Sequence, residues 1–194
     1  MLVVSGLTGV AEKIDLQIQK AFSHLLIIKT GVASTFVAER LNLAIKGLSN
    51  EQVVIPNLKI IDVGMLSQFG VGYQLREVQA GGNIKSAYVV EVGANGALAM
   101  QNNEYVSLDL KNLTAGATYA VYAVENPSLA RAFVKYQTEV VQGSEPTQRV
   151  FPLPTNLAMF AIKKNGALEK VTLTHNNGVQ VNYTPEELDA TARQ

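Results

Sequence analysis

Short segments in which apolar and polar residues alternate recur along most of this chain, and they restrict its fold more than any other feature. From Ile14 to Ile18 every second residue is apolar, with Asp15 and Gln17 between them. Because successive side chains of a β-strand point to opposite faces, this alternation predicts a strand with one buried face and one face in water. Further strands are predicted at Leu41–Ile45, Gln52–Ile55, Ser86–Val92, Ala97–Met100, Tyr105–Leu110 and Thr118–Glu125.

Other segments depart from simple alternation. The continuous apolar run His24–Lys29 predicts a strand that is buried on both faces. After Pro56 the apolar spacing changes to three or four residues, which predicts a short helix within Asn57–Phe69. The glycine-rich segment Gln68–Asn83 reads as a long irregular connection. Turns are predicted at Gly47–Asn50, Gly93–Gly96 and Thr114–Gly116.

Eight or so short strands at regular spacing favour an all-β fold, a jelly roll or β-sandwich, over a fold in which strands and helices alternate. We expect this jelly roll to span residues 1–126, followed by an extension, residues 127–194, that adds strands and a short C-terminal helix. Ser128–Val141 fits either a helix or a strand, and we favour the strand. Gly143–Pro154 contains three prolines and predicts an extended arm or linker.

The extension contains what reads as a partial internal repeat of the first domain. In order, the matching segments are Leu157–Lys164 with Leu25–Lys29, Lys170–His175 with Arg40–Ile45, Val179–Tyr183 with Glu51–Ile55, and a helix opening at Thr184–Leu188 with the helix after Pro56. This pattern fits either a partial second barrel or a tail on a one-barrel protein. We expect its strands to pack on the first barrel or on a neighbouring subunit, and the repeat favours the neighbour.

The repeated order of a strand, a turn such as Asn177-Gly178, a returning strand and a helix resembles the coat proteins of corticovirus-type, membrane-containing icosahedral bacteriophages. The resemblance implies tandem jelly rolls and a self-assembling icosahedral capsid subunit that is not an enzyme. It also implies trimers or larger shells, contacts with other virion proteins and peripheral contact with an internal membrane. The expected location is the virion, assembled in the host cytoplasm.

Composition agrees with a protein of an assembly. Only 16% of the 194 residues are charged, and 16 basic side chains balance 16 acidic ones. A weakly charged surface gives little protection against self-association. The densest basic cluster is Lys163-Lys164 with Lys170, so we expect no direct binding to nucleic acid. We expect neither a signal peptide in the Gly-interrupted N-terminus nor a membrane-spanning helix.

Residues that carry out catalysis are scarce, and we predict no catalytic residue, no cofactor and no metal. The chain has no Cys and two His, His24 and His175. A triad of Ser23 or Ser107, one His and Asp109 can be written down, but no nucleophile elbow supports it. Gly64–Gly82 lacks the spacing of a phosphate-binding loop. The oxygen-rich Gln101–Glu104, near Asp109, reads as a hairpin tip rather than a cation site.

A second resemblance leaves an alternative function open. The spacing of Leu113, Gly116 and Tyr119 is similar to the tyrosine corner of fibronectin type III domains. That resemblance implies a secreted or surface β-sandwich binding module, either an adhesin or a carbohydrate-binding domain. Its sugar platform would be formed by some of the seven tyrosines, although alternation makes most of them ordinary strand residues and the chain has no Trp.

Overall fold

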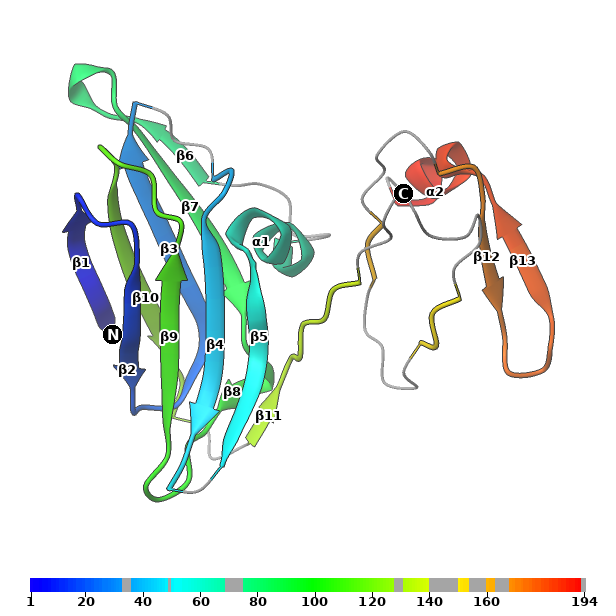
Figure 1. The fold of residues 1–194 in the computed structure, drawn as a ribbon, viewed down its shortest axis with the longest axis horizontal. Coiled ribbons are helices and arrows are strands. Elements are labelled where there is room, and N and C mark those ends of the chain that lie inside the picture. Colours follow the sequence, from blue (N-terminus) through cyan, green and yellow to red (C-terminus); the bar gives the residue numbers. More distant parts are fainter. Residues whose placement is uncertain are drawn as a thin grey trace. The chain divides into compact units, whose positions relative to one another are not determined.

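The computed structural model describes residues 1–32, 36–48, 50–68, 75–127, 131–139, 150–153, 160–162 and 168–192. The chain divides into two compact units, Met1–Pro152 and Leu153–Gln194. In the first unit two antiparallel sheets pack face to face, and Figure 1 shows one of them in front of the other. The second unit contains a hairpin and a helix.

Strands distant in the sequence are neighbours in both sheets. Sheet A has the order β1 (Leu2–Thr8), β10 (Thr118–Glu125), β3 (Phe22–Gly31), β7 (Ile84–Glu91) and β6 (Leu75–Val78); β8 (Gly93–Leu98) also pairs with β3, and β11 (Arg131–Phe133) pairs with β8. Sheet B has the order β2 (Lys13–Ile18), β9 (Tyr105–Lys111), β4 (Arg40–Lys46) and β5 (Glu51–Lys59). The chain passes between the sheets at each step from β1 to β4 and again from β9 to β10. These crossings make the two sheets a jelly roll, so the predicted all-β fold class is confirmed.

The core lies between the sheets and is built by the alternation seen in the sequence. In β3, Leu25 and Ile27 are fully buried, whereas their neighbours Leu26 and Ile28 on the other face are partly exposed. From sheet B, Leu41 and the other inward residues of β4 and β9 are buried in the same cluster. Each fully buried aliphatic side chain stabilises the fold by roughly 1.5–3 kcal/mol relative to an exposed one.

Helix α1 (Ile60–Gln68) follows β5 and packs against β7 beside the core. Its close approach depends on Gly64, because a Cβ atom there would lie 2.4 Å from the Tyr88 ring. The helix begins where the Ile60 N–H donates to the Glu39 carbonyl (3.0 Å). A helix within Asn57–Phe69 is therefore confirmed, although the first residues of that predicted range belong to β5.

The first unit continues past Asn126, where we expected the jelly roll to end. Arg131–Phe133 forms β11, and Tyr136 then docks into the core with its N–H donating to the Val54 carbonyl (3.0 Å) and its hydroxyl to the Glu91 carbonyl (2.9 Å). Residues 131–139 contain no helix, and their strand is only three residues long. Of the predicted arm, Gly143–Pro154, the structure describes residues 150–153, which have no regular structure.

One local prediction in sheet A is confirmed and one is wrong. The turn expected at Gly93–Gly96 lies within the bounds of β8, and it is present: a Cβ atom on Gly93 would lie 2.6 Å from the Ala97 Cα, whereas residues four apart in an extended strand are separated by about 13 Å. The connection expected to be irregular over Gln68–Asn83 contains β6, which pairs with β7, and a 3₁₀ turn at Ala80–Gly82. Residues 69–74 of that connection lie outside the described residues.

The second unit contains the predicted hairpin and helix. Strands β12 (Val171–Thr174) and β13 (Gln180–Tyr183) pair antiparallel, and helix α2 (Pro185–Ala192) follows. Thr184 and Glu187 cap this helix reciprocally: the Glu187 N–H donates to the Thr184 hydroxyl and the Thr184 N–H to the Glu187 carboxylate. Most of the predicted strand Leu157–Lys164 lies outside the described residues, and residues 160–162 have no regular structure.

Candidate functional site

The outer face of sheet A is apolar across four strands. Leu2 of β1 lies opposite Tyr122 of β10, Tyr122 opposite Leu26 of β3, and Leu26 opposite Val89 of β7. Leu2 is 51% exposed and Tyr122 37% exposed, while Leu26 and Val89 are partly exposed. Directly paired side chains on one face form a continuous contact surface. We call this set the apolar row.

A second uncharged row lies beside the apolar row, and charged residues border the two. Ala120, Ile28 and Ala87 pair in sequence across β10, β3 and β7. On one side of the two rows, Lys85 forms an ion pair with Glu77 (3.8 Å). On the other side, His24 lies opposite Glu91. An exposed apolar centre with a polar rim is the composition of a protein contact surface.

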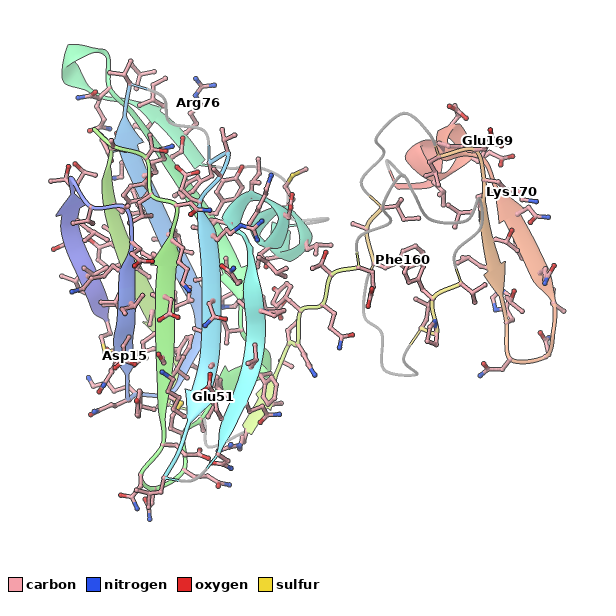
Figure 2. All side chains as sticks on the ribbon, viewed as in Figure 1. Asp15, Glu51, Arg76, Phe160, Glu169 and Lys170 are labelled. Atoms are coloured by element: carbon pink, nitrogen blue, oxygen red, sulfur yellow. The ribbon has the colours of Figure 1, made fainter. Side chains whose placement is uncertain are left out.

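The outer face of sheet B is polar, and its side chains bond to one another. Asp15 accepts hydrogen bonds from the Ser107 hydroxyl (2.8 Å) and from Gln17 (3.3 Å), and it forms an ion pair with Lys46 (3.5 Å). The Ser107 hydrogen bond is the largest factor that lowers the Asp15 pKa. Asp109 accepts a hydrogen bond from the Asp15 N–H (2.9 Å). It also accepts one from the side-chain amide of Asn42 on the neighbouring strand β4. Figure 2 shows Asp15 at this face, among the other side chains of the sheet.

A charged cluster lies buried between the two sheets. The Lys29 ammonium of β3 donates to the Glu39 carboxylate (2.6 Å), and both side chains are buried. The hydroxyls of Thr114 (2.7 Å) and Tyr119 (2.9 Å) donate to the same carboxylate oxygen. Lys29 also lies 5.7 Å from the centre of the Phe36 ring. Because Lys29 belongs to sheet A and Glu39 directly precedes β4 of sheet B, the cluster ties the sheets together.

These contacts keep Glu39 ionised. Burial would raise the Glu39 pKa, but hydrogen bonds from Lys29, Thr114 and backbone N–H groups outweigh burial and lower the pKa to about 2. Its second carboxylate oxygen accepts from the backbone N–H groups of Val37 and Ala38. Both carboxylate oxygens of Glu39 thus accept hydrogen bonds from groups of the protein itself. We call this cluster the clasp, because it links the two sheets.

The spacing that resembles a tyrosine corner produces a comparable contact here. The Tyr119 hydroxyl accepts from the Thr114 N–H (2.8 Å), five residues earlier, while it donates to Glu39. Burial raises the pKa of this hydroxyl, which therefore keeps its proton. The corner fixes the turn between β9 and β10, within a jelly-roll strand order.

The structure does not bring together the Ser, His and Asp side chains of the triad that the sequence allows on paper. His24 bonds to the adjacent Ser23 (2.9 Å) in sheet A, whereas Ser107 and Asp109 lie in sheet B and bond to Asp15. His175 lies in the second unit, where its N–H takes part in the β12–β13 hairpin. No Ser-His-Asp triad exists among these side chains.

The oxygen-rich hairpin tip is engaged in an ion pair. Glu104 binds Arg131 through both carboxylate oxygens and accepts from the Gln101 N–H (2.9 Å). Within the described ranges, no group of three or more His, Cys, Asp or Glu side chains is placed to hold a metal.

The tyrosines do not form one platform. Tyr88, Tyr119 and Tyr136 are buried, Tyr122 and Tyr105 lie on opposite outer faces, and Tyr183 belongs to the second unit. Tyr73 lies outside the described residues.

Comparison with known proteins gives no relative: no protein-family model matches this chain, and no curated protein sequence matches it. Neither helix in the described part of the chain is long and apolar enough to cross a membrane.

Proposed function

We propose that this protein is a structural subunit of an icosahedral virion shell, a capsid protein that packs against copies of itself through the outer face of sheet A. The observation that carries the proposal is the apolar row, Leu2, Tyr122, Leu26 and Val89, together with its uncharged neighbours. An apolar sheet face in contact with water is costly for a monomer, so its burial against another subunit is favourable.

Fold and composition support the same function. Jelly rolls serve as viral capsid domains, and also as lectin and cupin domains. The three uses differ in their sites. A barrel that binds a small molecule inside needs an interior cavity with a few polar groups, whereas the interior here holds apolar side chains and the hydrogen-bonded Lys29–Glu39 pair. The zero formal net charge favours close packing of identical subunits.

The assembly that we propose follows the resemblance to corticovirus-type coat proteins. Copies of the chain form trimers or a larger shell, together with other virion proteins and in peripheral contact with an internal membrane. Assembly takes place in the host cytoplasm, and the protein does not bind nucleic acid directly. The subunit has no catalytic role.

The test compares one tyrosine on each outer face. Tyr122→Glu places a charge in the apolar row, and Tyr105→Glu places the same charge on sheet B beside Lys46. We expect light scattering after size-exclusion chromatography to show an oligomer for the wild type. Self-association should weaken at least about tenfold in Tyr122→Glu and less than about twofold in Tyr105→Glu. A wild type that stays monomeric at high concentration, in low and high salt, would show that the proposal is wrong.

A β-sandwich binding module is the second candidate, and the Thr114–Tyr119 corner favours it. Such a module carries its ligand site on its own surface and works as a monomer. Monomeric behaviour combined with binding to an immobilised glycan or receptor would support this candidate over the shell protein.

A further inference from the structure

The second unit repeats a hairpin and helix of the first unit. Among the described residues, however, the first strand of the repeated hairpin has one neighbouring strand instead of two. In the first unit, β4 pairs with β5 on one side and with β9 on the other, and α1 follows β5. In the second unit, β12 pairs with β13 and α2 follows. Within residues 168–192, no strand lies on the other side of β12. The open edge of β12 therefore corresponds to the edge of β4 that β9 covers.

Backbone groups of β12 point out of this open edge. The His175 N–H donates to the Val179 carbonyl across the hairpin (2.9 Å). Because backbone polar groups alternate in direction along a strand, those of Thr172 and Thr174 point away from β13. An exposed row of such groups is a template for another strand, and an isolated two-stranded sheet is only marginally stable.

We propose that β12 pairs antiparallel with β12 of a second copy of this chain, about a two-fold axis at Thr172. The product is a four-stranded sheet, β13–β12–β12–β13, shared by two subunits. This inference rests on the proposed self-assembly and assigns one of its contacts to a particular strand edge. The interface is isologous, since the same residues contribute from both copies.

The sequence of β12 is complementary to itself in this register. Val171 lies opposite Leu173 of the second copy, so that apolar side chains meet on the face that also carries Val181 and Tyr183. Thr172 meets Thr172 on the polar face, where threonine pairs are favourable. Glu169, labelled in Figure 2 with Lys170 at the start of β12, lies opposite His175 of the second copy. A carboxylate thus faces an imidazole at both ends of the pairing.

Other registers lose this match. A shift of one residue would place threonines opposite the apolar residues and mix the two faces. A shift of two residues in one direction would place Leu173 opposite Glu169, and in the other direction Val171 opposite His175. Only the register centred on Thr172 pairs apolar with apolar and acid with imidazole.

Single cysteines test the register, because the chain has no Cys of its own. In the proposed pairing, residue 172 faces itself across a hydrogen-bonded pair, where the Cα atoms lie about 5.5 Å apart. A disulfide spans that distance. We expect full-length Thr172→Cys to form a disulfide-linked dimer under mild oxidation. Asn182→Cys, directly opposite on β13, and Thr174→Cys are the controls and should cross-link at least about tenfold more slowly.

Proline variants test the hydrogen bonds. Thr172→Pro removes an N–H that faces the second copy and leaves the β12–β13 ladder complete, whereas Asn182→Pro removes an N–H from the far edge of β13. Both variants lose the same Thr172–Asn182 side-chain hydrogen bond, so they are matched. We expect Thr172→Pro to weaken self-association about 30-fold, as for two lost hydrogen bonds. Asn182→Pro should change it less than about twofold.

The outcomes separate this inference from the proposed function. If the wild type self-associates but Thr172→Cys does not cross-link, or Asn182→Cys cross-links equally fast, the β12 pairing is wrong and the shell proposal stands. If the wild type never self-associates, both proposals fail. Rapid cross-linking of Thr172→Cys together with weak association of Thr172→Pro supports the pairing.

Discussion

The two outer faces of the jelly roll differ in chemistry, although their inner faces are alike. On β3 of sheet A the outward residues Leu26 and Ile28 are apolar, so this strand carries apolar side chains on both faces. On β4 of sheet B the outward residues include Asn42 and Lys46, which bond to acidic neighbours. Both strands direct Leu and Ile side chains into the same core.

This difference indicates which sheet has the composition of a covered sheet. Strands that are apolar on both faces are typical of sheets packed on both sides, whereas alternation of apolar and polar residues is typical of sheets with one face in water. Sheet B therefore completes its polar contacts within the subunit. Sheet A retains an apolar outer face, which we propose is buried against another subunit.

The largest expected effect is a loss of stability of the whole jelly roll, on which both outer faces depend. Glu39→Ala removes the carboxylate that joins Lys29 to Thr114 and Tyr119. Removing one partner of a buried ion pair costs about 3–5 kcal/mol. We expect the free energy of unfolding, measured by urea titration, to fall by that amount, a large share of the stability of an ordinary domain.

Two variants serve as controls for Glu39→Ala. Glu77→Ala breaks an exposed ion pair with Lys85 and should change the unfolding free energy by no more than about 1 kcal/mol. The double change Lys29→Met with Glu39→Met replaces the pair by apolar side chains and should recover most of the loss. A double variant as unstable as Glu39→Ala would mean that hydrogen bonds to Thr114 and Tyr119, not charge burial, dominate the clasp.

Acid should open the same clasp with a somewhat smaller effect. The Glu39 pKa is about 2 in the folded protein, below its ordinary value of 4.5. A lowered pKa contributes stability that is complete above about pH 4.5 and is lost as the pH falls towards 2. The loss amounts to about 3 kcal/mol.

The contribution of Glu39 can be separated from that of the other carboxylates. Hydrogen bonds also lower the pKa of Asp15 and Glu104, so the wild-type slope alone does not identify the group. The measurement is the difference in unfolding free energy between wild type and Glu39→Gln from pH 6 to pH 2. That difference should shrink as the pH falls, and a constant difference would contradict the assignment.

Alternation along the sequence predicted most of the jelly roll, because the core is lined by every second residue of each strand. It also predicted the hairpin and helix of the second unit, where Asn177-Gly178 and the Thr184–Glu187 cap are local signals. Contacts between distant segments were not predictable in this way. Arg131–Phe133 and Tyr136 join the first unit through β8 and Val54, and no local pattern names those partners.

The sequence carries one signal for the buried clasp. Lys29 follows Leu25 and Ile27 at every second position, which places its ammonium on the inner face of β3. A buried Lys requires a carboxylate partner, but spacing alone could not select Glu39 among the acidic residues. The apolar outer face was visible as the run His24–Lys29, whereas its cross-strand partners Tyr122 and Val89 depend on the register of three strands.

The smallest expected effect concerns salt, and it sharpens the comparison because contacts through the two faces should respond differently. Raising the salt concentration from about 0.05 M to about 0.5 M shortens the screening length from about 14 Å to about 4 Å. Contacts through the uncharged rows of sheet A should then change the dissociation constant of the assembly by less than about twofold, since apolar burial does not depend on charge. Contacts through Asp15, Lys46 and the other ionised groups of sheet B would weaken markedly in the same range. Sedimentation velocity at both salt concentrations distinguishes the two cases, with the wild type at the lowest measurable protein concentration as the reference for dissociated subunits. A steep loss of assembly at high salt would contradict an interface made mainly by the apolar face of sheet A, and would point to charged contacts, either those of sheet B or those of Glu169 with His175 in the β12 pairing.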